Sequence, residues 1–470
     1  MSLKKEYRYC APKRVQLVTL GCSKNRVDSE HLLKKIADAG IEIVPEENGL
    51  PIWEQVVEDG NTVTTHAERK VDAVIINTCG FIKDAKVESI NAIMAAVDAK
   101  NRGYIDYIFV FGCLSQRYND ELVAEIPEVD GFFGAFDMPA VLRALGVSDN
   151  KALDEHRYLT TPAHYAYLKI SEGCDRTCSY CSIPLIRGKH VSVPIENLVK
   201  ETENLAANGV KELIVIAQDT TYYGLDLYGR RALGELLERL CKVEGIEWIR
   251  LHYSYPAQFP QDVLDVMASN PKICKYLDIP LQHASTKLLK AMRRSIDGPQ
   301  TQKIIDDIRA KVPGVVLRTT MIVGHPGEDR REFEKLLSFV QKNRFERLGA
   351  FTYSEEEGTY GAANFKDTVR ESTKQKRYGE LMELQSAISL EYNESRIGSV
   401  ERVIVDSFSD GVFVTRSQQE SPEVDGEILV GKESFEAKFG EDFEPHSLIG
   451  TFANVKITGA NEYDLIAEFI

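Results

Sequence analysis

Three cysteines lie within eight residues in the stretch SEGCDRTCSYCSIP, namely Cys174, Cys178 and Cys181. Cysteine sulfur at this spacing is typical of a metal site, because thiolates bind both zinc and iron–sulfur clusters. A structural zinc site normally takes four ligands from two pairs, and no second pair lies in this part of the sequence. Three thiolates on a four-iron cluster leave one iron without a protein ligand. The motif therefore predicts an open iron at which a small molecule is bound and reduced.

A second set of cysteines is spread over the first quarter of the chain. Cys22, Cys79 and Cys113 each end an apolar run of strand type, in VQLVTLGC, VIINTC and YIFVFGC. Because the carboxyl ends of parallel strands share one sheet edge, we expect these side chains to meet in one crevice. Each also precedes a helical segment, whose positive N-terminal end favours the thiolate. Burial in the core is the alternative for any single free cysteine, but the repeated position favours a common site.

The other cysteines and the composition limit the classes of protein to which this chain can belong. Cys241 lies in a helical pattern and Cys274 precedes a strand, so we expect both to pack in the core. A chain of 470 residues with 43% hydrophobic composition needs no disulfides, and clustered cysteines then indicate metal or redox sites in a reducing compartment. No apolar run is long enough to span a membrane, and none follows the basic N-terminus. We expect a cytoplasmic protein without a membrane partner.

The pattern of apolar residues divides the sequence into three segments, and together they predict an α/β protein of several domains. In residues 1–150, strand-like runs alternate with amphipathic segments, which is the βαβ pattern of a parallel sheet. A polar interval near residues 46–70, with the alternating TVTTH, is interpreted as an insertion or a hairpin. The pattern thus predicts an N-terminal parallel-sheet α/β domain.

Residues 160–397 contain six further candidate strands, YAYLKI, ELIVIAQ, EWIRLHYS, YLDIPLQ, VVLRTTMIV and RLGAFTYS. Six βα units with right-handed crossovers predict an open, partial barrel whose chemistry lies at the carboxyl ends of its strands. A long amphipathic helix follows, with Leu381, Leu384, Ile388 and Tyr392 on one stripe, and we expect it to pack at the end of this domain.

Residues 398–470 contain five short alternating runs, which predict a small antiparallel β-barrel of the size of oligonucleotide-binding-like modules. These 73 residues hold 15 acidic and 5 basic side chains, a net charge of −10 out of −15 for the whole chain. Such a charge favours a basic partner over a phosphate backbone.

The whole chain resembles the radical S-adenosylmethionine methylthiotransferase family. Cys-x3-Cys-x2-Cys after the first strand of a partial βα barrel is the hallmark of the radical S-adenosylmethionine superfamily. GCSKNRVDSE, NTCGFI and GCLSQRY resemble the three cysteine segments of the family's N-terminal domain, and SEGCDRTCSYCSIPLIRG resembles its radical core. The ending, with SPEVDGEILV and LIGTFANVKITGANEYDL, is similar to its TRAM barrel. The resemblance implies an N-terminal α/β domain, a partial (β/α)6 TIM-like barrel and a C-terminal TRAM β-barrel.

The resemblance also implies an activity and its cofactors. Family members insert a methylthio group at an unactivated carbon, using one S-adenosylmethionine as methyl donor and another as the source of a 5′-deoxyadenosyl radical. An external electron donor and a sulfur source are then required. Two [4Fe-4S] clusters are implied, an auxiliary one on the first cysteine set and a catalytic one on the second: Cys22, Cys79, Cys113, and Cys174, Cys178, Cys181.

The resemblance also implies further contacts with the cofactor, but the motifs that carry them are less specific. Tyr180 would lie near the adenine of the cofactor. Further cofactor contacts are expected at two strand ends and in the GHPGE loop: Gln218, Asp219, Gln282, His283, Gly324, Gly327 and Glu328. His283 is equally well interpreted as a structural histidine. Two features depart from the family pattern, namely the long interval between Cys22 and Cys79 and the presence of His325 where an apolar aromatic is expected.

The family acts chiefly on two substrates, adenosine in transfer RNA and an aspartate β-carbon of small-subunit ribosomal protein twelve. GCSKN with RVDSE resembles the second branch, the RimO type, whereas the transfer-RNA branch more often reads GCQMN. A barrel that bound RNA should be rich in Lys and Arg, because phosphate contacts dominate affinity. The acidic barrel instead suits a basic ribosomal protein, although net charge also serves solubility.

We therefore expect methylthiolation of a protein aspartate, with no direct transfer-RNA substrate. Two alternatives remain open at this point. One is 2-methylthiolation of transfer-RNA adenosine, and the other is a non-catalytic protein that holds structural zinc or an electron-transfer iron–sulfur cluster.

Overall fold

The computed structural model describes residues 7–46, 54–58, 61–65, 71–440 and 444–470. The chain forms two compact units. The first comprises Met1–Thr160 with Ser182–Lys189, and the second comprises Thr161–Cys181 with His190–Ile470. No helix among the described residues combines the length and the apolar character that crossing a membrane requires.

The first unit is built on a five-stranded sheet in which all neighbouring strands are parallel. Its strands lie in the order β2 (Glu42–Val44), β1 (Arg14–Thr19), β5 (Val71–Thr78), β6 (Ile105–Gly112) and β7 (Gly131–Phe132). The two longest, β5 and β6, are almost entirely buried. Strands covered on both faces read as continuous apolar runs, which explains VIIN and IFVF in the sequence.

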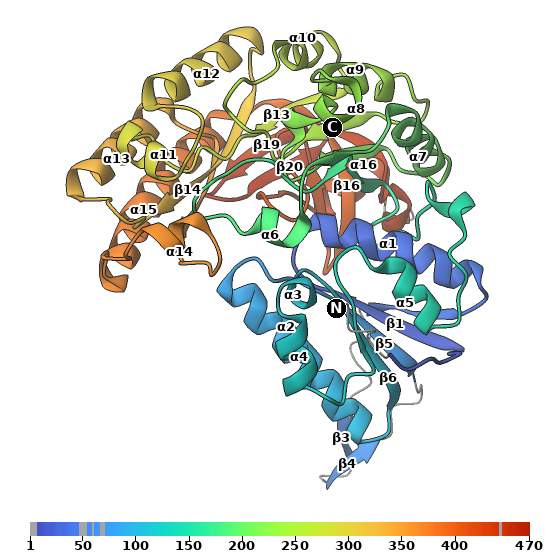
Figure 1. The fold of residues 1–470 in the computed structure, drawn as a ribbon. Coiled ribbons are helices and arrows are strands. Elements are labelled where there is room, and N and C mark those ends of the chain that lie inside the picture. The colour runs from blue at the N-terminus through green and yellow to red at the C-terminus, as the bar shows by residue number, and fades with distance from the viewer. Residues whose placement is uncertain (1–6, 47–53, 59–60, 66–70, 441–443) are drawn as a thin grey trace. The chain divides into compact units, whose positions relative to one another are not determined.

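Helices cover both faces of this sheet (Figure 1). On one face, α2 (Lys83–Asn101), α3 (Cys113–Arg117) and α4 (Asn119–Glu125) pack through Ile93, Leu114 and Leu122. On the other, α1 (Ser23–Asp38) and α5 (Met138–Ala144) pack through Leu32, Ile36 and Val141. A short 3₁₀ turn, η2 (Lys151–Leu153), follows α5. The predicted parallel α/β domain is confirmed.

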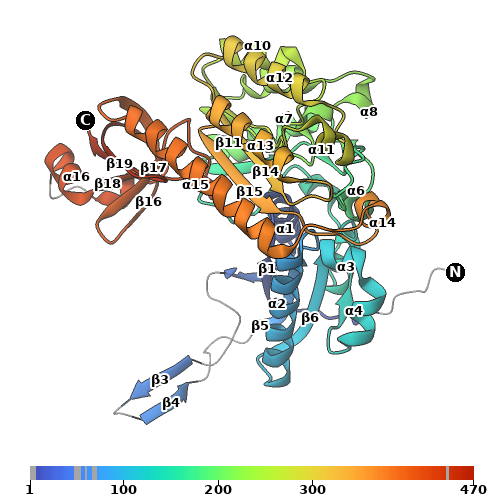
Figure 2. The ribbon, with the colours of Figure 1, turned by 90° about the vertical axis from the view of Figure 1, so that its left-hand side faces the viewer.

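The polar interval near residues 46–70 contains a hairpin (Figure 2). Strands β3 (Glu54–Glu58) and β4 (Asn61–Thr65) pair antiparallel, with Val56 opposite Val63. The hairpin interpretation therefore holds for these ten residues. The rest of the interval, 47–53, 59–60 and 66–70, lies outside the described residues.

The second unit contains a six-stranded parallel sheet in which the strands lie side by side in sequence order. These are β8 (Tyr165–Lys169), β11 (Glu212–Ile216), β12 (Trp248–Leu251), β13 (Ile273–Asp278), β14 (Val316–Val323) and β15 (Arg347–Thr352). Because each strand pairs with its predecessor and the first and last do not pair, the sheet is the open partial barrel that the sequence predicts. A two-stranded antiparallel sheet, β9 (Ser171–Glu172) and β10 (Val191–Ser192), follows β8.

The connecting helices form an outer layer along this sheet (Figure 1). They are α7 (Ile195–Ala207), η3 (Thr220–Tyr222), α8 (Leu225–Tyr228), α9 (Leu233–Leu240), α10 (Gln261–Ser269), α11 (Thr286–Ala291), α12 (Gly298–Lys311) and α13 (Arg330–Asn343). The short helix α14 (Tyr360–Asn364) follows the last strand, β15. Helix α12 begins with a capping box, in which Asp297 and Gln300 satisfy each other's backbone N–H groups. The short helix α6 (Ile183–Arg187) belongs to the first unit, although it follows Cys181 directly.

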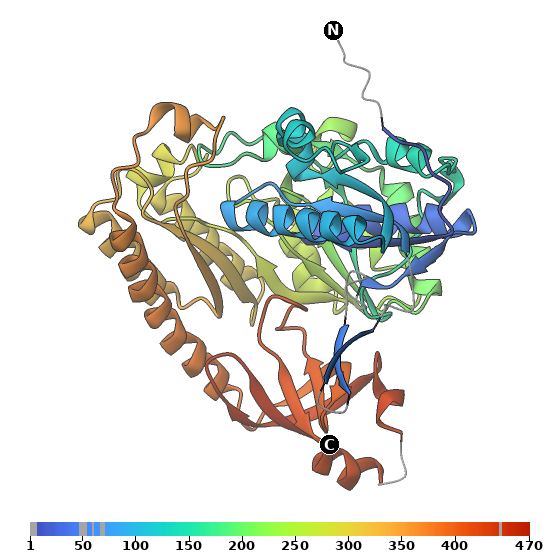
Figure 3. The same ribbon diagram turned by 90° about the horizontal axis from the view of Figure 1, so that it is seen from below.

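A long helix, α15 (Glu371–Ser395), packs along β15 and continues to the C-terminal barrel (Figures 2 and 3). Leu381 and Ile388 of the predicted stripe are buried, and Leu384 is partly buried. Tyr392 packs against a buried cluster that includes Trp248 of β12 and Ile404 of the barrel, so the end of the stripe reaches the barrel. The amphipathic reading of this helix is confirmed.

The C-terminal residues form a closed five-stranded barrel with strand order β16 (Val400–Ser409), β17 (Val412–Arg416), β18 (Ile428–Gly431), β20 (Leu465–Phe469), β19 (Phe452–Ala460). Four strand pairs are antiparallel as predicted, but β18 and β20 pair parallel. Helix α16 (Lys432–Phe439) and the turn η4 (Pro445–Leu448) lie between β18 and β19, and Phe435 fills the barrel core beside Phe413.

Buried ion pairs join this barrel to the amino-terminal ends of the sheet strands. Glu212, the first residue of β11, binds Arg250 at 2.9 Å and Arg416 of the barrel at 2.8 Å. Arg416 also binds Asp406 at 2.5 Å, and His164 binds Asp406 at 2.7 Å. The barrel is therefore attached at the edge opposite to the carboxyl ends of the strands.

Several acidic residues of the barrel form internal contacts of this kind and so do not contribute to a charged surface. Besides Asp406, Glu420 is buried against two arginines, Glu423 accepts hydrogen bonds from two tyrosine hydroxyls, and Asp425 lies 3.6 Å from Arg318. A net charge counted from sequence cannot separate such internal pairs from a surface. The charge argument for a basic partner accordingly rests on exposed residues such as Asp410, Glu433, Glu444 and Glu468.

Replacing Glu420 with Gln should lower the free energy of unfolding by about 3–5 kcal/mol, because it leaves two buried guanidinium groups without their shared counter-charge. Glu420 binds Arg347 at 3.2 Å and Arg396 more closely still. Burial opposes its ionisation, but these two charges outweigh burial and lower its pKa to about 2. Denaturant unfolding of the variant measures the loss.

The matched control is Glu436→Gln, which removes a partly exposed pair with Lys432 and should cost at most about 1 kcal/mol. Since the pKa of Glu420 is lowered by folding, its contribution is complete above the unfolded value of about 4.3 and disappears as the pH falls toward about 2. Equal losses in both variants at neutral pH would contradict the assigned role of Glu420.

Candidate functional site

The first cysteine set lies at the carboxyl ends of three adjacent strands. Cys22 follows β1 and is the N-cap residue of α1, Cys79 follows β5, and Cys113 follows β6 as the first residue of α3. Because β1, β5 and β6 are neighbours in the sheet, the three cysteines share one edge, as the sequence predicts. All three lie in the first unit.

The turns that carry these cysteines are packed against one another. Gly21 has φ +92°, and a Cβ atom there would lie 2.6 Å from Cys79 Cβ and 2.9 Å from Cys79 Sγ. A Cβ atom on Gly80 would lie 2.8 Å from Leu114 Cα, in the turn that begins with Cys113. Only glycine allows this close approach. The glycine before Cys22 and the glycine after Cys79 therefore have a steric cause.

Replacing Gly21 with Ala should therefore displace Cys79 and remove most of the iron of the cluster that the resemblance implies for this cysteine set. The matched control is Gly40→Ala, because Gly40 also has a positive φ, +82°, but has no atom within 4 Å of its Cβ position. Both variants carry the backbone strain of roughly 1 kcal/mol or more, and only Gly21→Ala adds the clash with the thiol. Iron analysis after anaerobic reconstitution measures the difference. Equal iron content in the two variants would show that the clash does not matter.

Burial, rather than the helix ends, dominates the protonation of these thiols. It raises the pKa of Cys79 to about 12 and raises the pKa of Cys113, with the neighbouring cysteines adding to the effect. Burial opposes the thiolate at these two residues, so the expectation that helix N-termini favour it stays a prediction. A bound cation would supply the missing positive charge, since a metal deprotonates its coordinating thiol.

The second cysteine set lies in the loop after β8 and β9, within the second unit. Main-chain hydrogen bonds hold this loop: Ser179 N donates to Met292 O at 2.9 Å, and Gly361 N donates to Ser179 O at 2.6 Å. Cys174, Cys178 and Cys181 are all partly exposed, so the loop is anchored while its thiols remain accessible. This placement after the first barrel strand is the one that the sequence predicts.

The site also contains two arginines and a tyrosine that were not predicted from the sequence. Arg294 Nη1 lies 3.9 Å from Cys178 Sγ and donates to Tyr180 Oη at 3.3 Å. The ring of Tyr255 lies between two guanidinium groups, with Arg176 at 3.9 Å and Arg294 at 4.2 Å from its centroid. Arg176 lies inside the cysteine motif and could have been noticed, whereas the folding of Arg294 and Tyr255 onto the loop has no local signal.

Both arginines keep unused donors. Arg176 Nε binds Asp219 at 2.8 Å, but Arg176 Nη2 is buried without a hydrogen-bond partner among the described residues. The same is true of Arg294 Nε, within that part of the chain. Buried N–H groups are costly to leave unpaired. The site therefore suits a ligand that brings acceptor atoms, such as a carboxylate.

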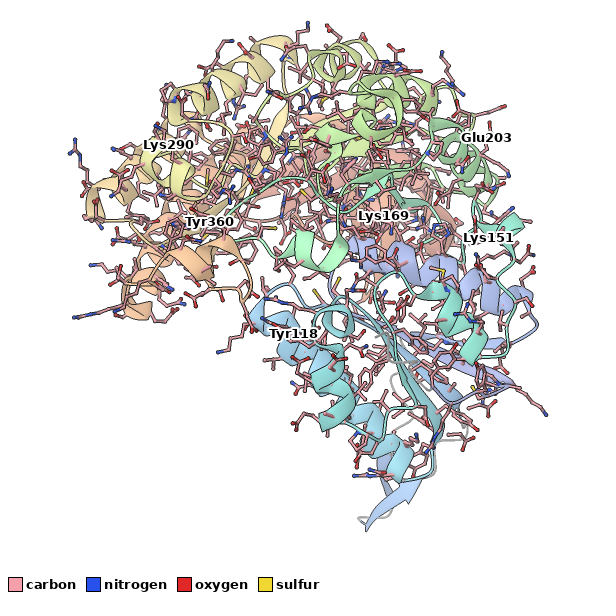
Figure 4. The ribbon with its side chains drawn as sticks, in the orientation of Figure 1. Tyr118, Lys151, Lys169, Glu203, Lys290 and Tyr360 are labelled. Atoms are coloured by element: carbon pink, nitrogen blue, oxygen red, sulfur yellow. The ribbon has the colours of Figure 1, made fainter. Side chains whose placement is uncertain are left out.

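Gln218 and Asp219 follow β11 at the same edge of the sheet. Gln218 Nε2 donates to Glu172 at 2.6 Å, and Glu172 pairs with Lys169 at 2.8 Å (Figure 4 labels Lys169). Gln218 Oε1 is buried and has no partner among the residues described. Asp219 forms an ion pair with Arg176. A cofactor contact at Gln218 stays a prediction, supported by this unused acceptor.

The GHPGE loop is tied to its neighbours. A Cβ atom on Gly324 would lie 2.4 Å from Lys374 Cγ, and Gly324 N donates to Glu328 Oε2 at 3.0 Å. Gly327 has φ +89° and open space around it. Thus Gly324 has a structural reason to be glycine, and cofactor contacts at either glycine stay predictions. His325 is buried between Tyr353 and Phe365, and burial lowers its pKa.

His283 fits the structural interpretation. Its Nδ1 accepts from the backbone N–H groups of Ala284 and Ser285 at 3.0 Å, so Nε2 carries the proton and faces Glu328 at 3.4 Å. Gln282 has φ 73° and pairs through its backbone with Met321, within β14. Cofactor contacts at Gln282 and His283 stay predictions.

The chemistry of the donor sets can be compared with the clusters that the resemblance implies. Among the described residues, no three Cys, His, Asp or Glu side chains surround a single ion position. Iron–sulfur clusters are held by cysteine thiolates distributed over several irons, so that arrangement is not required. Both sets contain only cysteine, and each has a guanidinium group near sulfur, with Arg187 Nε 3.2 Å from Cys113 Sγ and Arg294 Nη1 3.9 Å from Cys178 Sγ, which fits iron–sulfur clusters.

Comparison with known proteins agrees with these features. The family model of the Radical SAM superfamily matches residues 168–340, that of the TRAM domain matches 397–470, and that of Uncharacterized protein family UPF0004 matches 50–134. Among solved structures, the radical S-adenosylmethionine methyltransferase TsrM from Kitasatospora setae aligns with a TM-score of 0.54 at 13% identity, covering 86% of this chain and 77% of that one. This likeness shows the fold alone.

Curated relatives match over nearly the full length. The ribosomal protein uS12 methylthiotransferase RimO of Cytophaga hutchinsonii is 50% identical over 97% of this chain and 98% of its own length. RimO of Flavobacterium psychrophilum is also 50% identical with the same coverage, and RimO of Bacteroides fragilis is 47% identical over 97% of this chain and 99% of its own length. The chain therefore belongs to the family of the ribosomal protein uS12 methylthiotransferase RimO, within the radical SAM superfamily.

Proposed function

We propose that this chain transfers a methylthio group to the β-carbon of an aspartate in ribosomal protein uS12. The observation that carries the proposal is the near-complete alignment with uS12 methylthiotransferases at about half identity, together with two all-cysteine sets placed at strand ends. The transfer-RNA alternative has no observation in its favour. The non-catalytic alternative does not account for the buried unpaired donors beside the second set.

The proposed cofactors are two [4Fe-4S] clusters and S-adenosylmethionine. Cys22, Cys79 and Cys113 would hold the auxiliary cluster, and the three cysteines of the loop after β8 would hold the other: Cys174, Cys178 and Cys181. When bound, these groups supply one-electron cleavage of the sulfonium and a site for sulfur. An external electron donor and a sulfur source complete the reaction.

The residues around the second set have separate tasks in this proposal. The unused N–H groups of Arg176 and Arg294 bind carboxylate oxygens, which both S-adenosylmethionine and the target aspartate possess. Tyr255 holds the two guanidinium groups apart by stacking between them. Tyr180 is kept as a neutral phenol, since burial and the adjacent cysteines raise its pKa well above the usual value. The main-chain bonds of Ser179 keep the loop in place during turnover.

In this proposal, residues 1–150 serve the auxiliary site, 160–397 serve radical chemistry and 398–470 serve the substrate. The exposed acidic residues of the barrel would attract a basic ribosomal protein, as complementary charge speeds encounter. Since the substrate is a ribosomal component, the reaction would take place in the cytoplasm.

The direct test incubates the anaerobically reconstituted enzyme with S-adenosylmethionine, reductant and a sulfide source, in the presence of either purified uS12 or transfer RNA. We expect a methylthio mass gain on one aspartate of uS12 and none on RNA. A mass gain on RNA alone would contradict the proposed substrate. Release of 5′-deoxyadenosine with no methylthio product on uS12 or on RNA would contradict the proposal that a methylthio group is transferred.

A further inference from the structure

Arg187 ends the helix α6, six residues after Cys181 in the sequence, and it folds with the first unit. Its side chain is 3% exposed. A guanidinium group this deeply buried needs partners for its donors, because an unpaired buried charge is very costly. The partners it has are not those of an ordinary structural arginine.

Three atoms surround the guanidinium group of Arg187. Its Nε lies 3.2 Å from Cys113 Sγ, its Nη1 donates to Asp28 Oδ2 at 2.8 Å, and its Nη2 donates to Asn25 Oδ1 at 2.6 Å. Asp28 and Asn25 thus fix the plane of the group, with the Nε–H directed at the sulfur. A positive charge is thereby held against one thiol of the first cysteine set.

The residues that orient Arg187 are themselves fixed at the strand ends. Asn25 Nδ2 donates to Leu20 O at 2.8 Å and to Thr78 O at 3.1 Å, and these are the carbonyls just after β1 and at the end of β5. Asn25 and Asp28 both belong to the segment GCSKNRVDSE. The polar residues of this segment therefore tie together the two turns before Cys22 and Cys79, while Arg187 reaches the turn of Cys113.

A second buried arginine of the same unit shows what a structural role looks like. Arg157 binds Glu30 of the same segment, with Nε donating at 2.9 Å and a second, closer contact through Nη2. Glu30 also accepts from Thr160 N at 2.9 Å. No sulfur takes part in these contacts. Arg157 therefore provides a comparison whose side chain has similar burial and charge but binds a carboxylate in place of a thiol.

We propose that Arg187 is a positioning residue that orients Cys113 and raises the reduction potential of the auxiliary cluster, an inference that rests on the proposed function. The potential of an iron–sulfur cluster depends on its net charge and on hydrogen bonds to its sulfurs. An N–H donor with a full positive charge, directed at a ligand sulfur, stabilises the more negative, reduced state. Asp28 and Asn25 act through Arg187 by holding its donor in that direction.

The test measures the midpoint potential of the auxiliary cluster by EPR-monitored redox titration. The full-length chain carries alanine at Cys174, Cys178 and Cys181, so that only the first set contributes. In this background, Arg187→Gln should make the potential more negative by at least about 59 mV, which is tenfold in the one-electron equilibrium. Arg187→Lys, which keeps the charge without the fixed fork, should recover part of the shift. Arg157→Gln should lower the melting temperature and leave the potential unchanged.

The outcomes separate this inference from the proposal on which it rests. A parent protein that binds no cluster at the first set would contradict the proposed function itself. An unchanged potential in Arg187→Gln, with full iron content, would overturn the inference. Loss of iron in Arg187→Gln but not in Arg157→Gln would support positioning of Cys113. Equal loss of iron in both variants would overturn it, because only general destabilisation would then be involved.

Discussion

Cys178→Ala is expected to abolish the release of 5′-deoxyadenosine from S-adenosylmethionine. Cys178 is the central cysteine of the loop after β8, and its sulfur is the one that Arg294 approaches. With two thiolates left, the loop would no longer hold the proposed cluster, which would carry the electron to the sulfonium. Chromatographic measurement of 5′-deoxyadenosine per chain, under excess reductant, should give a value at the level of the protein-free control.

The matched control is Cys274→Ala. Cys274 is a fully buried cysteine on β13 that belongs to neither set, so its replacement costs packing energy but no ligand. This variant should cleave S-adenosylmethionine at close to the parental rate once it is folded. Substantial cleavage by Cys178→Ala, or its loss in both variants at equal iron content, would contradict the assignment of the second set.

Cys79→Ala is expected to stop methylthio transfer to uS12 while cleavage of S-adenosylmethionine continues. Cys79 belongs to the first unit, whereas the loop with the second set belongs to the second unit, so removal of this thiol leaves the cleavage site intact. Mass spectrometry of uS12 and quantification of 5′-deoxyadenosine in the same reaction measure the two outcomes separately. The ratio of product to cleavage should fall to near zero.

Cys241→Ala serves as the control for this variant, because Cys241 is buried at the end of α9 and lies in neither cysteine set. It should keep both activities. If Cys79→Ala lost cleavage as completely as Cys178→Ala while still holding the second cluster, the two sets would not have separate tasks.

The positions of the six cysteines could be predicted because they depend on short-range patterns. Apolar runs such as VIIN and IFVF identify buried strands, and a parallel sheet brings their carboxyl ends to one edge. The partial barrel followed in the same way from repeated βα units. These features need only local periodicity and one topological rule.

The surroundings of the cysteines could not be predicted because they come from distant segments. Arg294 and Cys178 are 116 residues apart in sequence, and Arg187 and Asn25 are 162 apart. No pattern around Arg187 indicates that it folds with the first unit. Such contacts depend on tertiary packing, which composition and spacing do not encode individually.

Burial bears on two further differences. The helix ends after β5 and β6 suggest thiolates, whereas desolvation acts in the opposite direction and raises the pKa of Cys79. The acidic count of the barrel suggests a charged surface, yet Asp406 and Glu420 are consumed in internal ion pairs. The parallel pairing of β18 with β20 arises from closure of the barrel, which five short strands in sequence do not reveal.

Two separate four-iron sites are the central claim of this account, and iron content tests it most directly. Three anaerobically reconstituted proteins are compared: the parent, the variant with alanine at Cys22, Cys79 and Cys113, and the variant with alanine at Cys174, Cys178 and Cys181. We predict about eight irons per chain in the parent and about four in each variant. A parent that bound two zinc ions and no iron, or a variant that lost all its iron while remaining folded, would contradict the account.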